Sequence, residues 1–521
     1  MKNPAFCQRP KASYLMQTDN TQANSNPPAP QQPTLNTQRF RLTRFDRIVA
    51  LVMLLIVAAI GLTMLLGDRV GVTLVRVGPL GTARSTSSIT LQFSESMNRA
   101  SVEPRLKLVQ IPLQKINEVI SDTDILATVA GISSWNGSIF NFRPTTALLP
   151  GGSYAVMFTA GASSESGRQV LSDYQYSFTV RSARLAYLAP ATSTPFNLWI
   201  SDPADPSSAR QITTSPSGIY DYDISPDGSQ IAFSEKNSNT GTMDIKLLDL
   251  ESGVVEQLTN CADAECKTPV WRPDGQIIAY ERIDLNSNLS QQVGASPTRI
   301  WLLDLSSKPA TTRPMFSDSQ ILGYGLRWSA DGSRVSMYDY GSQSILIYDF
   351  RTDTTELIPS RYGTPGELSP DGTKVIYPEI QLTESQAISY LQMANLTTKE
   401  LARVSNPDDP VDEDTAIWSP DGSFLIVGRR YLDERATRGR QLYKVSPVDG
   451  SSEPLLVDAR YQNGFFSLDP TGTQLVIQRF PDPVAMNDPN NMGIPEIWVL
   501  SLLDKSLTKV TDNAIFPRWV P

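Results

Sequence analysis

The stretch Ser225-Pro226-Asp227-Gly228-Ser229-Gln230-Ile231-Ala232-Phe233 joins a tight turn to an apolar strand, and variants of it occur six times. In such a turn, proline presets the backbone angle of the second position, aspartate hydrogen-bonds back to the backbone, and glycine adopts the left-handed conformation. The pattern predicts that these aspartates form turns and are neither catalytic residues nor metal ligands. The six turns begin at Ser225, Arg272, Ser329, Ser369, Ser419 and Asp469.

The spacing of these turns predicts the fold. Their glycines lie 47, 57, 40, 50 and 50 residues apart, and a strand-rich repeat of this length is typical of the four-stranded blades of a β-propeller. Residues 516–521 look like a strand that precedes a turn, whereas residues 184–188 look like one that follows it. We therefore expect these two strands to pair and to close a ring of seven blades over residues 183–521, with six or eight blades as the alternatives.

Histidine is absent from all 521 residues. Its absence removes the commonest general base, the Ser-His-Asp and Cys-His arrangements and the commonest zinc ligand. The sequence therefore predicts a protein that is not an enzyme, with no catalytic, cofactor-binding or metal-binding residues. Net charge is −9, and residues 185–521 hold 27 basic against 44 acidic side chains, which argues against a nucleic-acid partner because phosphates need a basic surface.

Two of the three cysteines, Cys261 and Cys266, lie close together within the repeat region, and Cys7 lies near the N-terminus. The close pair can form a small disulfide if its loop faces an oxidising compartment. Without histidine or a second pair of cysteines, it makes a poor zinc site. The sequence leaves the state of this pair open.

Residues 1–47 are expected to be a disordered tail, because residues 17–38 are rich in Gln, Asn and Pro and almost lack large apolar side chains. Residues 48–66 carry no charge and could span a hydrocarbon core of about 30 Å as a helix. A cleaved signal peptide and a buried helix are the alternatives. The apolar run is longer than the core of a signal peptide, and no small-residue cleavage site follows Leu66. We therefore predict a transmembrane helix over residues 48–66.

The flanking charges predict the orientation of that helix. Arginines at positions 39, 41, 44 and 47 precede it, whereas Asp68 and Arg69 nearly cancel after it. The positive-inside rule places the N-terminus in the cytoplasm and the domains after residue 70 outside the cell membrane.

Residues 71–182 alternate apolar and polar side chains between Gly and Pro turns and show no helical pattern, which predicts a β-sandwich. The segment Ile89-Thr90-Leu91-Gln92-Phe93-Ser94-Glu95-Ser96-Met97-Asn98 resembles the opening of bacterial Ig-like domains, and residues 149–154 and 176–180 resemble later parts of that family. The resemblance implies a spacer or adhesion module without chemistry of its own. Glu95 is then a residue at a strand end and not a ligand or a catalytic acid.

The repeats resemble those of TolB-like propellers, in which Trp-Ser-Pro-Asp-Gly precedes a strand such as Ile-Ala-Phe, as Trp418 to Gly422 illustrate here. The resemblance covers residues 185–521 and implies protein–protein binding in the periplasm or at the cell surface. Some positions depart from the pattern in ways that core packing tolerates, including Ala330 for Pro, Thr471 for Asp, and Leu368 and Leu468 for Trp.

Two charged runs are further candidates. Residues 406–414 hold five carboxylates, which could bind Ca²⁺, although a solvated acidic loop explains them as well. Residues 429–440 hold the arginines 429, 430, 435, 438 and 440, which could contact a partner or simply form a charged loop.

These observations favour a membrane-anchored cell-envelope protein. Its extracytoplasmic propeller is expected to bind a protein or glycan partner, with the Ig-like domain as a spacer. The alternatives are a carboxylate- or metal-dependent hydrolase or lyase on the propeller face, and a transmembrane sensor.

Overall fold

A computed structural model describes residues 43–65, 71–285, 287–290, 292–382, 387–405, 409–482, 484 and 493–521. Two compact units are distinguished, Met1–Arg69 and Val70–Pro521. Cys7 and the predicted disordered stretch 17–38 lie outside the described residues.

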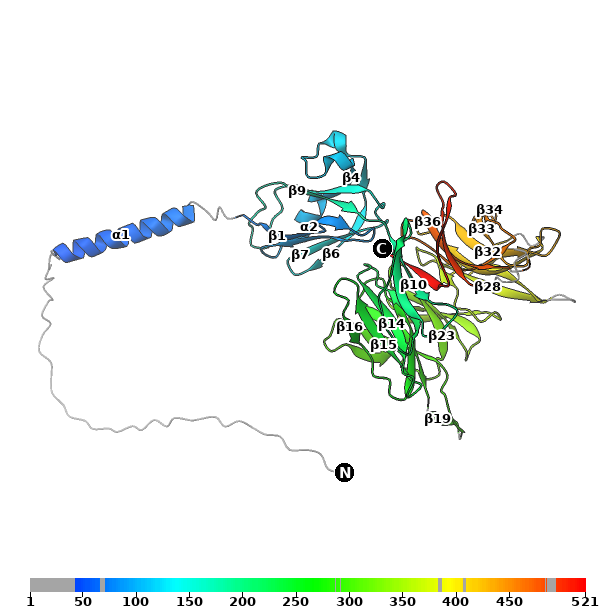
Figure 1. Cartoon of the computed structure of the whole chain (residues 1–521). Coiled ribbons are helices and arrows are strands. Elements are labelled where there is room, and N and C mark those ends of the chain that lie inside the picture. The colour runs from blue at the N-terminus through cyan, green and yellow to red at the C-terminus, as the bar shows by residue number, and fades with distance from the viewer. Residues whose placement is uncertain are drawn as a thin grey trace, which may run out of the picture. The chain divides into compact units, whose positions relative to one another are not determined.

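In the first unit, helix α1 (Arg44–Leu65) covers most of the predicted transmembrane segment (Figure 1). Thr43 caps it, since its hydroxyl accepts the N–H of Asp46 at 3.3 Å, and the carboxylate of Asp46 accepts the backbone N–H of Thr43 at 2.9 Å in return. Across the described part of the chain, no helix is long and apolar enough to cross a membrane. The predicted transmembrane helix over residues 48–66 is therefore not supported. Its predicted last residue, Leu66, lies outside the described residues.

Residues 71–180 form two sheets with strand orders β1-β3-β7-β6 and β2-β9-β8-β4-β5. The first sheet consists of β1 (Leu74–Gly78), β3 (Ile89–Phe93), β7 (Ile139–Pro144) and β6 (Gly131–Asn136). The second consists of β2 (Gly81–Ala83), β9 (Tyr174–Val180), β8 (Ser153–Phe158), β4 (Leu106–Ile111) and β5 (Ala127–Val129).

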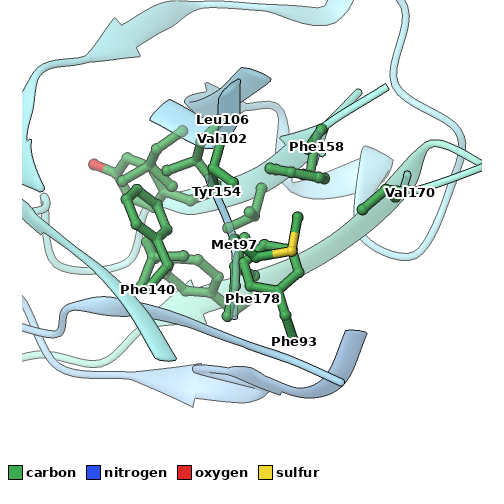
Figure 2. Packing of buried hydrophobic residues seen from close by; sticks show 14 of the residues in the cluster. Phe93, Met97, Val102, Leu106, Phe140, Tyr154, Phe158, Val170 and Phe178 are labelled. Carbon is green, nitrogen blue, oxygen red and sulfur yellow. The ribbon is translucent and has the colours of Figure 1, made fainter. Parts of the chain in front are cut away.

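The inward side chains of both sheets share one hydrophobic core, so the predicted β-sandwich is confirmed. Figure 2 shows Phe93, Phe140 and Phe178 within this core. The connections between the strands also hold the short helix α2 (Arg99–Val102) and three 3₁₀ turns. Helix α2 forms because Val102 is fully buried and packs into the same core. The 3₁₀ turns are Glu103–Arg105, Leu113–Lys115 and Asp122–Asp124.

Apart from the hairpin of residues 287–290 and 292–294, the described strands from residue 184 onward form seven four-stranded units, the number predicted. Unit 1 contains β39 (Ile515–Val520), β10 (Arg184–Ala189), β11 (Asn197–Asp202) and β12 (Asp205–Gln211). Unit 2 contains β13 (Ile219–Ile224), β14 (Gln230–Lys236), β15 (Met243–Asp249) and β16 (Val255–Gln257). Unit 3 contains β17 (Ala264–Trp271), β18 (Ile277–Asp284), β21 (Arg299–Asp304) and β22 (Thr311–Pro314).

The remaining units follow in chain order. Unit 4 contains β23 (Gly323–Trp328), β24 (Arg334–Asp339), β25 (Ser344–Asp349) and β26 (Thr354–Pro359). Unit 5 contains β27 (Glu367–Leu368), β28 (Lys374–Leu382), β29 (Ala387–Asn395) and β30 (Leu401–Arg403). Unit 6 contains β31 (Val411–Trp418), β32 (Leu425–Tyr431), β33 (Gln441–Val445) and β34 (Ser452–Leu456). Unit 7 contains β35 (Tyr461–Leu468), β36 (Gln474–Pro481), β37 (Glu496–Ser501) and β38 (Leu507–Asp512).

The ring closes as the sequence predicts. Strand β39, red in Figure 1, pairs antiparallel with β10, with Trp519 opposite Leu185. A separate hydrophobic cluster lies between each unit and the next, including one that joins unit 7 to unit 1 through Val476 and Tyr187. Because every unit is packed on both sides, no unit is left with an unpaired face.

The repeated turns are stabilised by their own side chains. The hydroxyl of Ser225 donates to Asp227 at 2.7 Å and accepts the N–H of Gln230 at 2.9 Å. Asp227 also accepts the N–H of Ser229 at 2.9 Å, and Gly228 has a φ of +65°. The serine–aspartate pairs of the turns at 329, 369 and 419 have the same geometry. The carboxylates of these turns are therefore engaged by donors of the turn itself.

The question left open for the cysteines is settled, since Cys261 and Cys266 form a disulfide at the start of β17. Both residues are buried in the core between units 2 and 3. Next to this disulfide, Met243 of β15 pairs with Glu265 of β17, and this single parallel pair joins the two units into one eight-stranded sheet.

Candidate functional site

The two faces of the ring carry different connections. The turn face holds the first-to-second and third-to-fourth strand turns, which are uniformly short, such as residues 225–229 and 250–254. The opposite face, called the insertion face below, carries the second-to-third strand connections and the links between units. Its connections range from residues 340–343 to residues 285–298, which include the hairpin β19 (Ser287–Ser290) and β20 (Gln292–Gly294). Variable connections on a rigid scaffold usually carry binding function, so the insertion face is the candidate surface.

The acidic and basic runs lie opposite each other at the insertion-face ends of β31 and β32. In the strand register, Asp412 pairs with Arg430 and Glu413 with Arg429. Guanidinium-to-carboxylate distances are 2.7 Å for Arg429–Glu413 and 2.8 Å for Arg430–Asp412. Arg440 adds contacts of 3.0 Å to Asp412 and to Asp414. Three arginines of the basic run therefore pair with the acidic run, whereas Arg435 and Arg438 pair with Asp433 and Asp482 outside it.

The Arg429–Glu413 pair is the most buried ion pair of this cluster, with side chains 1% and 0% exposed. The hydroxyl of Ser405 also donates to Glu413. Burial acts to lower the pKa of Arg429, but the charge of Glu413 and the hydrogen bonds to Glu413 and Tyr431 together outweigh it and raise that pKa. Desolvation acts to raise the pKa of Asp412, but the hydrogen bonds from Ser389 and the charge of the arginines lower it. Both groups therefore stay ionised at neutral pH.

The calcium interpretation of the acidic run finds no support in the described residues. No group of three His, Cys, Asp or Glu side chains among them is placed to hold a metal ion. Residues 406–408 of the predicted run lie outside the described residues. Glu95 of the Ig-like domain is likewise engaged, since it accepts a hydrogen bond from Ser166 at 2.7 Å and pairs with Arg168 at 3.1 Å.

A second charged group lies where unit 1 meets unit 2. Arg518 of β39 lies 3.6 Å from both Asp221 and Asp223 of β13, and its side chain is 32% exposed. Asp223 also accepts the backbone N–H of Trp271 at 2.8 Å. Burial raises the pKa of Asp223. A carboxyl with a raised pKa can act as a general acid, but this one is held by the arginine and by the backbone of unit 3, as expected of a group that joins the blades.

A cavity of about 590 Å³ opens at the insertion face between units 4 and 5, a size common for small-molecule sites. It is lined mainly by polar and aromatic side chains, including Tyr338, Ser360, Arg361, Glu379 and Tyr390. These come from β24, from the link after β26, and from β28 and β29. Sequence analysis did not point to this cavity, because its residues are scattered over four strands, the connection 340–343 and one link between units, and form no motif.

Two segments of the chain match known family models. Residues 68–180 match the bacterial Ig-like domain, and residues 217–355 match the N-terminal β-propeller domain of prolyl oligopeptidase. The chain thus combines a segment similar to bacterial Ig-like domains with a segment similar to that β-propeller domain. No curated protein matches the chain as a relative.

Solved structures with a similar fold include TolB from Acinetobacter baumannii, with 18% identity, 58% of this chain and 76% of that chain covered, and a TM-score of 0.36. An oligogalacturonate lyase from Vibrio parahaemolyticus has 14% identity, coverage of 64% and 85%, and a TM-score of 0.43. A puromycin-hydrolyzing peptidase of Mycobacterium tuberculosis has 11% identity, coverage of 70% and 52%, and a TM-score of 0.47. At these values the likeness concerns the fold alone.

Proposed function

We propose that the chain is a non-enzymatic binding protein of the cell envelope, whose propeller binds a protein or glycan partner through the insertion face. The Ig-like domain serves as a spacer. The observation that carries this proposal is the asymmetry of the ring, since one face has uniform short turns and the other has both the variable connections and the 590 Å³ cavity. The charged groups of the two clusters described above are paired with each other, as in Arg429–Glu413 and Arg518–Asp223, which supports a structural role for these residues.

An extracytoplasmic location for the propeller is part of the proposal. The Cys261–Cys266 disulfide supports it, because disulfides persist in oxidising compartments and are rare in the cytosol. Protease added to intact cells should degrade the propeller, and full protection would contradict this location.

Attachment to the cell membrane, with the N-terminus in the cytoplasm, is also proposed. It is supported by the large apolar side chains of α1, which are exposed from Phe45 to Ile60, and by the arginines that precede them. Carbonate-washed membranes should retain the full chain and release a chain that lacks residues 44–65. Equal release of both would remove this part of the proposal.

Site-specific photo-cross-linking of the full chain in cells tests the choice of face. A photoreactive amino acid in place of Tyr340, 46% exposed on the insertion face, should give a discrete adduct. The matched control is Val448, which is 90% exposed on the turn face and should give none. Adducts at Val448 alone, or equal adducts at both positions, would contradict the proposal.

A further inference from the structure

The cavity between units 4 and 5 contains a buried polar group without a partner. Ser360 is only 3% exposed and lines the cavity, and its hydroxyl has no hydrogen-bond partner among the described residues. Its backbone is fixed, because its carbonyl accepts a bond from the hydroxyl of Tyr338 at 3.4 Å. Burying an unpaired hydroxyl is unfavourable. A ligand that hydrogen-bonds to Ser360 would remove this penalty.

Other polar groups of the cavity are held in place before any ligand arrives. The carboxylate of Glu379 accepts the backbone N–H of Arg361 at 3.2 Å and that of Ile380 at 2.9 Å. The hydroxyl of Ser342 donates to Asp339 at 2.6 Å, which leaves its lone pairs available as acceptors. Because these groups are already oriented, a ligand would spend little entropy in ordering them.

The charges in the cavity lining balance. Arg361 is the one cation and Glu379 the one anion among the lining residues, so the lining favours neither a strongly acidic nor a strongly basic ligand. The uncharged lining groups include the hydroxyls of Ser342 and Ser360 and the amide of Gln343. Such a set of donors and acceptors matches a neutral ligand that carries many hydroxyl groups.

Aromatic rings supply the apolar part of the lining. Tyr338 is supported by Tyr324 and Tyr340, with ring centroids 6.0 and 6.3 Å away. The ring of Tyr390 is held by the guanidinium of Arg403, 4.6 Å from its centroid. A pyranose ring presents an apolar C–H face and a rim of hydroxyls, so rigid tyrosines beside mixed polar groups suit it.

We propose that this cavity binds a short neutral saccharide. Ser360 and Gln343 would donate to its hydroxyls, Glu379 would accept from them, and Tyr338 and Tyr390 would contact the C–H face. The inference rests on the proposed function, because it names the ligand class of the same insertion face.

The test is calorimetric titration of the full chain with cellobiose, mannobiose and N,N′-diacetylchitobiose. The acidic disaccharide of hyaluronan and trialanine are the comparison probes. We expect at least one neutral disaccharide to bind more tightly than both comparison probes. Binding of none of the three, or tighter binding of the acidic sugar or the peptide, would overturn the inference.

Variants locate the binding in the cavity. Ser360→Ala should weaken it about 3- to 10-fold, the effect of one neutral hydrogen bond, and Glu379→Gln about 10-fold or more, because a charged acceptor is lost. The matched control is Thr364→Val, which also removes an unpartnered buried hydroxyl but at a residue that does not line the cavity, and it should leave affinity unchanged. Unchanged affinity in both cavity variants would overturn the inference. Should either variant fail to fold, Arg361→Ala, at an exposed residue, replaces it.

Failure here and failure of the proposed function have different signatures. If no saccharide binds but the photoreactive residue at position 340 still gives its adduct, the insertion face remains the binding surface and the saccharide assignment is wrong. If both fail, the binding face itself is wrong.

Discussion

Replacing Arg429 by methionine would leave the carboxylate of Glu413 buried without its counter-ion. The two groups are 2.7 Å apart and their side chains are 1% and 0% exposed, so solvent cannot compensate for the lost partner. Breaking such a pair from one side lowers the free energy of unfolding by about 3–5 kcal/mol. Glu413→Leu should have an effect of the same size, since it leaves Arg429 buried and unpaired.

The double variant Arg429→Met/Glu413→Leu measures how much of the lost stability comes from the interaction between the two charges. Because both charges are then gone, we expect it to recover at least half of the summed loss, a coupling energy of about 3 kcal/mol or more. Arg430→Met is the matched control on the neighbouring residue, whose side chain is 40% exposed and whose partner Asp412 keeps Arg440. It should change stability by less than about 1 kcal/mol.

The assay is urea unfolding of the full chain followed by tryptophan fluorescence, because urea, unlike guanidinium, does not screen charges. Two results would refute the reasoning. One is a loss for Arg429→Met no larger than that for Arg430→Met. The other is a double variant whose loss equals the sum of the two single losses.

Three further predictions concern the seam, where β39 pairs with β10 and unit 7 packs on unit 1, the disulfide, and the turns. Trp519→Ala removes a side chain that is 7% exposed in the seam core, and should lower the unfolding free energy by about 3–5 kcal/mol; unchanged thermal unfolding would contradict the role of β39. Reducing the Cys261–Cys266 bond should lower the free energy of unfolding by about 2 kcal/mol, judged from its short loop. The control is the Cys261→Ala/Cys266→Ala variant, whose stability a reductant should not change. A reductant that also destabilises this variant would show that the effect has another cause. Hydrogen bonds from serine hydroxyls lower the pKa of Asp449 and Asp504 to about 2; their contribution is therefore present above pH 3.8 and lost as the pH falls to about 2. Acid unfolding should show that Asp449→Asn weakens this dependence, and an unchanged profile would argue against it.

The repeat architecture could be predicted because each blade contains a turn that can be recognised from a few neighbouring residues. A turn such as Ser419 to Gly422 needs specific residues at fixed offsets, and seven strand sets follow from six turns and one split blade. Closure by β39 was readable from the two incomplete ends of the repeat region. In the Ig-like domain, β3 and β9 show clear alternation, whereas β6, with the sequence Gly-Ile-Ser-Ser-Trp-Asn, has too few apolar side chains to show it.

The charged candidates could not be resolved from sequence. Whether residues 412–414 bind a cation depends on what lies opposite them, and only the strand register places Arg429 against Glu413. The cavity between units 4 and 5 is harder still, because Ser360 and Tyr390 are brought together by the packing of neighbouring blades and share no local pattern. Both the charged cluster and the cavity are therefore formed by pairing and packing between segments that are distant in sequence.

The closure of the ring by β39 also determines how the propeller carries load. The chain enters the ring at Arg184, on the turn face, where β10 pairs with Val520 of β39. Under the proposed function, a pull between a tether at this point and a partner bound on the opposite face would act along the axis of β10. It therefore loads the hydrogen bonds to β39 and β11 side by side, in shear, because these bonds run across the strand. Rupture then requires many bonds to break together instead of unzipping one by one, so the seam is arranged to withstand tension.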